Sequence, residues 1–348
     1  FMSSVDKEKM NEIFSGLDRD SVVGILMHPS PDPDCLGSAA GMSVLIKEIY
    51  GLNSKIFHFG EVSHPQNKSL KNVLHIMLED GNDFDPKNCA ATILVDTDLQ
   101  SSGFKSETFT KVDVRLDHHA MDRNNGSNLT DVRPIGATCS IIWDYLREFE
   151  VSLEEYSDAA TAMVIGIKTD TLDFTSSNTS KLDMEAFRGL LPFVDKISLA
   201  KVTKYPLPKM VFEIEAKAYK NKEIINTTLV SFVGDVTAHN RDIIPTIADR
   251  FSRMDGISTA VILGVIDNHV IASVRSDDAR VDVNDLCVNT FGKSHAGGKE
   301  GSGGARFPLG AAYELLGDKE IKEKVKEEVV SQLKLRIFEE LGEHKEEL

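Results

Sequence analysis

Short apolar runs alternate with longer amphipathic stretches through the first half of the chain. The runs VVGILMH, KIFHFG, ATILVDT and VDVRLDHH begin at residues 22, 55, 91 and 112, and polar or charged residues gather at their ends. Apolar runs of this length are typical of strands buried on both faces, and helices between them favour parallel pairing. The pattern therefore predicts a parallel sheet with flanking helices.

Helical spacing of apolar residues occupies four further stretches, namely 36–50, 136–150, 154–170 and 182–195. The stretch KYPLPKM at 204–210 then interrupts the periodicity with two prolines. We therefore expect a first domain over 1–195, a linker over 196–212 and a second domain over 213–348. A chain of 348 residues is long enough for two packed cores.

The second half repeats the alternation on a smaller scale. Strand-like runs at 226–235 and 259–276 alternate with helical stretches at 243–254 and 282–292. The tetrapeptide IDNH, at 266–269, lies between β-branched residues and predicts a hairpin turn. The fold class is therefore α/β in both halves, with a parallel-sheet N-terminal domain and a smaller α/β C-terminal domain.

The C-terminal stretch alternates charge signs and carries apolar residues at helical spacing, namely Ile321, Val325, Val329, Leu333 and Ile337. This spacing predicts an amphipathic helix packed on the second domain. A contact between two copies of the chain is the alternative, so a homodimer stays open.

Charge and composition narrow the class of protein. A net charge of −16 argues against a protein that holds long nucleic acid, which needs a basic groove, but it allows a short anionic substrate. Apolar runs stay short of the roughly 18 residues of a membrane span. The four cysteines have no CxxC spacing and are expected to be reduced. We expect a soluble, cytoplasmic protein without a membrane partner.

Histidines and aspartates recur where the apolar runs end: His28, Asp32 and Asp34, then Asp96 and Asp98, then Asp117, His118 and His119, and finally Asp170 and Asp173. Any one of these aspartates alone is more often a turn or helix-cap residue. The carboxyl ends of parallel strands meet at one edge, however, and converging carboxylates repel one another unless cations lie between them. A mixed Asp/His set suits Mn²⁺ or a similar metal better than Ca²⁺.

The motifs HPSPDPDCLGS, VDT, LDHH and KTDT, taken in this order, resemble those of the DHH phosphoesterase superfamily over roughly residues 20–195. The resemblance implies a catalytic domain that binds two divalent cations, with Mn²⁺ expected and Mg²⁺ or Co²⁺ as alternatives. It implies these ligand roles: His28, Asp32 and Asp170 on the first metal, Asp34 and His118 on the second, and Asp96 bridging both. It also implies two catalytic residues, Asp117 behind His118 to orient it and His119 facing the substrate phosphate.

The second half resembles the DHH-associated substrate domain of the nanoRNase, oligoribonuclease, pAp phosphatase and cyclic-dinucleotide phosphodiesterase group. The similar segments are SVRSDD at 273–278 and a glycine-rich loop at 292–310. The resemblance implies these substrate-binding residues: Arg275, His295, Gly297, Gly298, Gly303, Gly304 and Arg306. The chain departs from the group because His295 precedes the glycines. An ordinary surface connection is the other interpretation of the loop.

Together these features predict a two-metal phosphoesterase, with its active site in a cleft between the domains. The expected substrates are short oligonucleotides or small nucleotides, such as pAp or cyclic dinucleotides. An inorganic pyrophosphatase or other phosphoanhydride hydrolase is the alternative, although the second half lacks an SRKKQ-like basic element. A non-catalytic nucleotide sensor is less favoured because no ligand of the set is missing. Arg123 and Asn124 are further candidates for phosphate contact, or members of a solvated loop.

Overall fold

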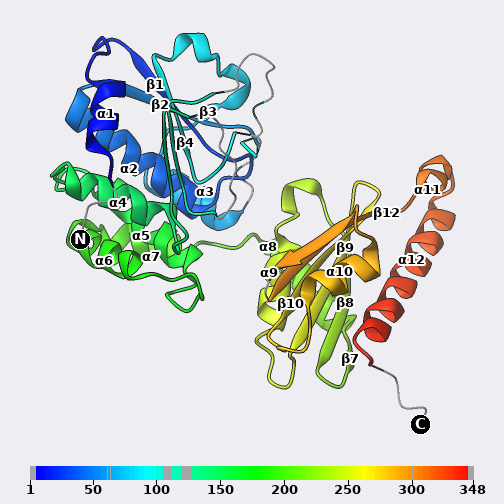
Figure 1. Cartoon of the computed structure of the whole chain (residues 1–348). Coiled ribbons are helices and arrows are strands. Elements are labelled where there is room, and N and C mark those ends of the chain that lie inside the picture. The colour runs from blue at the N-terminus through cyan, green and yellow to red at the C-terminus, as the bar shows by residue number, and fades with distance from the viewer. Residues whose placement is uncertain are drawn as a thin grey trace. The chain divides into compact units, whose positions relative to one another are not determined.

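The chain folds into two compact units, Phe1–Pro206 and Leu207–Leu348, in this computed structural model (Figure 1). The structure describes residues 5–343 apart from 61, 63, 100, 103, 105–110, 120–126 and 300. The boundary between the units falls inside the predicted linker. Most of that range is helical, however. Helices α7 (Lys196–Thr203) and α8 (Lys209–Lys220) enter it from either side, and only the proline-containing segment between them is not helical.

The first unit is built on a six-stranded sheet in the order β3-β2-β1-β4-β5-β6. Its strands are β1 (Val22–Leu26), β2 (Asn53–His58), β3 (Glu79–Asp80), β4 (Ala91–Val95), β5 (Val114–Asp117) and β6 (Leu129–Val132). Each pair of neighbours is parallel, so the predicted parallel sheet is confirmed. The sequence did not predict the edge strands β3 and β6, because they are short and rich in polar residues.

Helices of the first unit flank this sheet: α1 (Lys7–Phe14), α2 (Pro33–Tyr50), α3 (Pro65–Val73), α4 (Thr138–Glu148), α5 (Ser157–Asp170), α6 (Lys181–Leu190) and α7. Helix α2 begins at Pro33 because the Asp32 side chain accepts a hydrogen bond from the Cys35 amide. It ends where Gly51 adopts a left-handed conformation, with φ of 66°. The four helices expected in this half are confirmed within a few residues at each end.

The second unit has a mixed sheet in the order β11-β12-β10-β9-β8-β7. Its strands are β7 (Glu223–Ile225), β8 (Thr228–Asp235), β9 (Thr259–Ile266), β10 (His269–Ser276), β11 (Ala296–Lys299) and β12 (Ser302–Pro308). Its helices after α8 are α9 (Ile243–Phe251), α10 (Val283–Phe291), α11 (Ala311–Leu315) and α12 (Lys319–Glu340). Residues of α10 and α12 share one core cluster and residues of α8 and α9 another, so helices cover both faces of the sheet.

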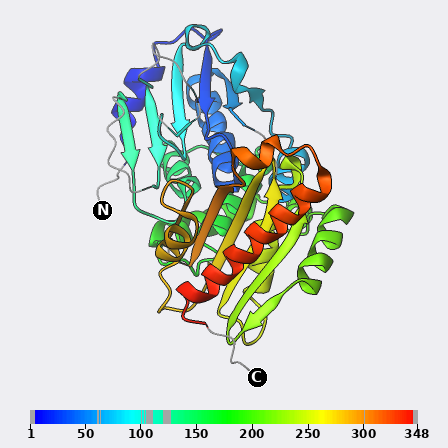
Figure 2. The same ribbon diagram turned by 90° about the vertical axis from the view of Figure 1, so that its right-hand side faces the viewer.

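The long helix α12 lies across one face of the second sheet (Figure 2). Leu333 and Ile337 are buried there, as the amphipathic spacing predicts. Ile321 is 48% exposed, so the expectation that it packs on the domain is wrong.

The second unit contains two β-hairpins whose formation depends on particular residues. Asp267 and Asn268, with φ of 45° and 60°, form the tight turn between β9 and β10, so the predicted hairpin is confirmed. The segment expected to be a glycine-rich loop is instead a second hairpin, in which β11 pairs with β12. Gly303 allows this pairing because a Cβ there would lie 2.7 Å from the Cys287 sulfur on α10.

Close packing of α2 on α5 depends on small residues, and this leads to a stability prediction. A Cβ at Gly37 would lie 2.8 Å from the Ala162 carbonyl oxygen, whereas a Cβ at Gly16 would meet nothing within 4 Å. We expect Gly37→Ala to lower the free energy of unfolding by about 1–3 kcal/mol, because the backbones must move apart. Urea unfolding of both variants measures this, and equal midpoints for Gly37→Ala and Gly16→Ala would contradict it.

Candidate metal centre

The predicted ligands gather at the carboxyl edge of the first sheet, where three neighbouring strands end. His28 follows β1, Asp96 follows β4, and His118 follows β5. Asp34 lies in the first turn of α2, and Asp170 is the last residue of α5. The structure thus brings together side chains that are up to 142 positions apart in the sequence.

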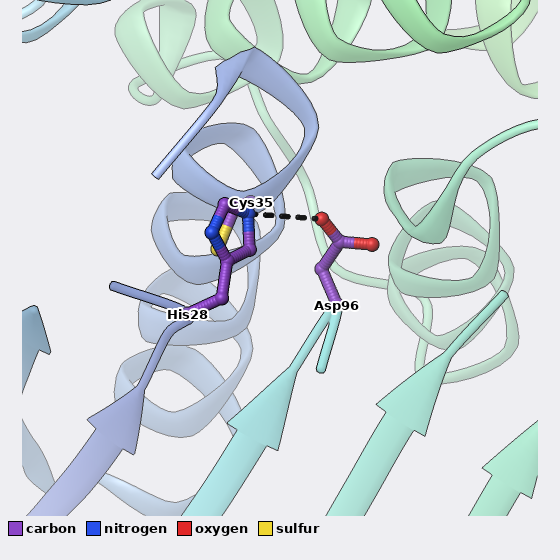
Figure 3. Close-up of side chains that lie close together, drawn as sticks. All are labelled: His28, Cys35 and Asp96. Atoms are coloured by element: carbon purple, nitrogen blue, oxygen red, sulfur yellow. Dashed lines mark ion pairs between the residues drawn. The ribbon is translucent and has the colours of Figure 1, made fainter. Parts of the chain in front are cut away.

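One group of donors forms around His28. Its Nε2 atom lies 3.7 Å from Asp32 Oδ2 and 3.8 Å from Asp96 Oδ2. The Cys35 thiol lies beside this pair, with ligand atoms of His28, Cys35 and Asp96 all within 4.8 Å of one another (Figure 3). The sequence interpretation missed Cys35 at this site, although its place directly after Asp34 was a signal.

A second group forms around His118. Its Nε2 atom lies 3.4 Å from Asp96 Oδ1, 3.3 Å from Asp170 Oδ2 and 4.0 Å from Asp34 Oδ2. Asp96 therefore presents one oxygen to each group, the arrangement that a bridging ligand needs. Asp170 lies with Asp34 and His118, whereas the resemblance assigned it to the metal of His28.

The His118 ring shows the geometry of a metal ligand. Its Nδ1 atom is hydrogen-bonded to the Ile135 carbonyl at 3.0 Å, which leaves Nε2 as the free ring nitrogen. That Nε2 atom is buried and has no hydrogen-bond partner. An unpartnered buried nitrogen facing three carboxylates fits a divalent cation, because a cation satisfies the nitrogen and the carboxylates at once.

Asp117 has a different neighbour from the one expected. Its Oδ1 atom accepts hydrogen bonds from the backbone and Nδ1 nitrogens of His119, at 3.1 and 2.9 Å. Its Oδ2 atom accepts a bond of 2.5 Å from Arg115. The prediction that Asp117 orients His118 is therefore wrong: Ile135 orients His118, and Asp117 orients His119. His119 remains half exposed, as a residue that faces substrate would be.

The N-terminus of α4 also supports the site. Asp34 accepts hydrogen bonds from the backbone nitrogens of Thr138 and Cys139, at 2.6 and 2.9 Å. The Thr138 hydroxyl donates to Asp96 Oδ1 at 2.9 Å. These contacts hold two carboxylates in fixed orientations. No local pattern of residues indicated these contacts, because they join residues 104, 105 and 42 positions apart.

Without cations, the negative charges of these buried, neighbouring carboxylates are unfavourable. Burial, together with the charge of Asp170, raises the pKa of Asp34 to about 7. Burial and the surrounding aspartates also raise the pKa values of Asp96 and Asp170. The pKa of His118 rises to about 9: burial alone would lower it, but the nearby carboxylates of Asp170 and Asp34 outweigh that effect. Divalent cations would relieve this repulsion and favour the ionised carboxylates.

Two other aspartates of the motifs have structural roles. Asp98 accepts hydrogen bonds from the amide and hydroxyl of Ser101, at 2.9 and 3.0 Å. Asp173 forms an ion pair with Lys168 at 2.8 Å. The alternative of a turn or cap residue therefore holds for both. Arg123 and Asn124 lie outside the described residues.

The predicted substrate-binding residues lie together in the second unit, on β10 and the β11–β12 hairpin. Arg275 is opposite Ser302, Ser273 is opposite Gly304, and Gly304 is opposite Gly297. Directly opposed residues point to the same face of a sheet, so Arg275, Gly297 and Gly304 share one face. Arg306, two residues further along β12, is on this face as well, whereas Gly298 and Gly303 lie on the α10 side. His295 immediately precedes β11 and is exposed.

Arg275 is already partnered in this structure. Its Nε atom donates to Asp249 at 2.5 Å, and its Nη1 atom donates to the Ser273 hydroxyl at 3.1 Å. An anionic ligand on this face would compete with Asp249 for the guanidinium group.

Within the described residues, we find no helix whose length and apolar character would let it cross a membrane.

These observations define an α/β protein with a candidate dinuclear metal site at the carboxyl edge of a parallel sheet. Residues 22–167 match the DHH family, N-terminal domain. An uncharacterised protein of Methanocaldococcus jannaschii is 33% identical over 329 residues, which cover 93% of this chain and 65% of that protein.

Two relatives with functional names are more distant. A probable manganese-dependent inorganic pyrophosphatase of Lactobacillus gasseri is 27% identical over 172 residues, covering 48% of this chain and 53% of that protein. A bifunctional oligoribonuclease and PAP phosphatase of Mycoplasma pneumoniae is 25% identical over 239 residues, covering 66% and 70%. The chain thus spans less than two thirds of the length of the first two relatives described.

The fold has a close match among solved structures. An exopolyphosphatase-related protein from Bacteroides fragilis superposes with a TM-score of 0.69 at 14% identity, covering 97% of this chain and 98% of that chain. This likeness confirms the α/β fold of both units.

Because the carboxylates repel one another without cations, Asp170→Asn should have opposite effects on stability without metal and with metal. Without metal, Asp170→Asn should raise the free energy of unfolding at pH 7 by about 1 kcal/mol, or roughly 2–4 °C in Tm, because it removes a charge whose pKa is raised on folding. With Mn²⁺, the same variant should lose most of the metal-induced gain in Tm, since a ligand is weakened. Thermal unfolding with EDTA and with Mn²⁺ measures both, and a variant less stable in EDTA would contradict the first sign.

Proposed function

We propose that this chain is a metal-dependent phosphoesterase that uses two divalent cations, with Mn²⁺ preferred. The observation that carries the proposal is the position of Asp96, whose two oxygens face separate donor groups around His28 and His118. His28, Asp32 and Asp96 would hold one cation, and Asp34, Asp96, His118 and Asp170 the other. When bound, two cations supply positive charge to both the attacking and the leaving oxygen of a phosphoryl group.

The protein's own residues would position the substrate phosphate. Because His119 Nδ1 is bonded to Asp117, the other ring nitrogen, Nε2, would be the one available to the substrate. The amides at the start of α4 and the Thr138 hydroxyl would keep Asp34 and Asp96 fixed when substrate enters. The sheet edge thus supplies both the cation ligands and a group that can contact a phosphate oxygen.

For the substrate class, we propose short oligonucleotides or small nucleotides. The second unit would hold them, through Arg275 and Arg306 beside the glycines of the β11–β12 hairpin. Glycines let a phosphate approach backbone amides closely, and arginine binds phosphate with two parallel hydrogen bonds. Support comes also from the relative in Mycoplasma pneumoniae, whose name describes an oligoribonuclease and PAP phosphatase.

Pyrophosphate hydrolysis is the second candidate function. It is favoured by the similarity of the first half to a probable manganese-dependent inorganic pyrophosphatase. The second unit argues against it, because it has no SRKKQ-like basic element. A non-catalytic sensor is disfavoured, since each expected ligand is present at the sheet edge.

The test is Mn²⁺-dependent hydrolysis of pApA, a 3–5-nucleotide RNA, pAp, cyclic di-AMP and pyrophosphate in parallel. We expect turnover of at least one nucleotide substrate, and loss of more than about 100-fold in Asp96→Asn, because the shared ligand is lost. Asp98→Asn is the matched control, since that buried aspartate lies in the same segment and bonds Ser101. Cleavage of pyrophosphate alone would support the second candidate instead.

The role of the second unit can be tested separately. Arg275→Ala should raise KM for pApA by about 10- to 100-fold, since a charge-assisted pair contributes roughly 1.5–3 kcal/mol. Pyrophosphate turnover, if present, should change less. Arg280→Ala is the control, because Arg280 is exposed and forms an ion pair with Asp278, two positions away. Steady-state kinetics would reject the assignment if both variants had the KM of the wild type.

A further inference from the structure

A buried arginine lies beneath the metal centre. Arg115 is 1% exposed, and it is the largest fully buried side chain among the described residues. It sits on β5 between Val114 and Leu116, which are both fully buried. Removing a guanidinium group from water is costly unless charged and polar partners surround it, so a purely packing role would favour an apolar residue here.

The bonds of Arg115 reach two different loops of the site. Its Nη2 atom donates to Asp117 Oδ2 at 2.5 Å, and Arg115 and Asp117 share one face of β5 because they are two positions apart. Its Nε atom donates to the Thr97 carbonyl at 3.2 Å. One rigid, planar group therefore ties the segment after β4 to the segment after β5.

Both segments need such support. Asp96, directly before Thr97, has a φ of 58°, a left-handed conformation that costs energy in a residue other than glycine. The Asp96 amide donates to the Leu116 carbonyl at 2.9 Å, so the Thr97 bond to Arg115 adds a second tie to the same strand. Asp117 in turn uses its other oxygen to hold His119.

We propose that Arg115 is a positioning residue that holds the bridging carboxylate of Asp96 and the imidazole of His119 in one fixed frame. It acts on His119 through Asp117 and on Asp96 through the Thr97 carbonyl. His119 Nδ1 lies 3.7 Å from Asp96 Oδ1, so a shift of either segment changes the separation between the cations and the group that contacts substrate. The consequence for turnover rests on the proposed function, while the consequence for metal binding does not.

The principal variant is Arg115→Lys, with Arg115→Met as a second. Lysine keeps a positive charge next to Asp117, but one ammonium group lacks the planar fork that reaches both Asp117 and Thr97. Arg133 supplies the matched control, because it too is a largely buried arginine of the first unit, paired with Asp131 and Asp144. The Arg133 amide bonds the Asp117 carbonyl at 3.0 Å, and both substitutions keep that backbone bond. Arg133→Lys and Arg133→Met therefore report the loss of buried side-chain ion pairs with residues that are not metal ligands. Thermal unfolding establishes which variants fold.

The first readout is Mn²⁺ affinity, followed by the EPR signal of the free ion. We expect Arg115→Lys to raise the Kd at least about tenfold and Arg133→Lys to leave it within about twofold, since supporting partners of metal ligands contribute 10- to 100-fold. Equal affinities for wild type and Arg115→Lys would overturn the proposal, and so would an equal loss in the Arg133 control. Failure of the wild type to bind Mn²⁺ would overturn both this inference and the proposed function.

The second readout separates action through His119 from general damage. In an otherwise wild-type chain, Arg115→Lys should lower kcat about 10- to 100-fold with little change in KM. The reason is that misplacement of His119 affects the reacting geometry more than substrate binding. In a His119→Gln background, the same substitution should lower kcat clearly less, since the group it positions is gone. Fully additive effects would overturn the action through His119. If wild type bound Mn²⁺ but hydrolysed no substrate, the proposed function would fail while the affinity test of Arg115 stood.

Discussion

Repulsion among buried carboxylates at the end of one parallel sheet is the constraint on which the first unit depends. Burial and the charges of neighbouring aspartates raise the pKa values of Asp34, Asp96 and Asp170. A folded chain tolerates such a cluster only if other groups hold it in place and cations compensate its charge. The contacts around the cluster meet the first of these two requirements, because they hold the carboxylates in place.

The support comes from elements that approach the sheet edge from different directions. The amides at the start of α4 bind Asp34, and the Thr138 hydroxyl binds Asp96. Arg115 lies on strand β5 of the sheet, and its hydrogen bond to Asp117 holds that carboxylate. Fixed donors of this kind reduce the reorganisation that a site must undergo when its cations and substrate bind. Glycines are needed where α2 and α5 pack closely beside the site, since a Cβ at Gly166 would lie 2.8 Å from the Asp34 Cα atom.

The second unit contributes a different kind of surface. Its face at β10 and the β11–β12 hairpin combines arginines with glycine, and under the proposed function this face would bind anions rather than metal ions. The chain as a whole carries a net charge of −16, so such a local basic group stands out against an acidic background. A division of labour in which one unit holds cations and the other holds the anionic substrate is consistent with the proposed phosphoesterase.

The sequence by itself determined the α/β class, most of the strands and helices, and which histidines and aspartates follow the strands, because strand ends and chemical type are local properties. Only the tertiary structure decided how those donors group. It placed Asp170 with His118 rather than His28, gave the orientation of His118 to Ile135 and that of His119 to Asp117, and brought Cys35 to the site. It also turned the expected glycine loop into a hairpin. These outcomes depend on contacts between distant segments and on packing space, which no local pattern of residues encodes.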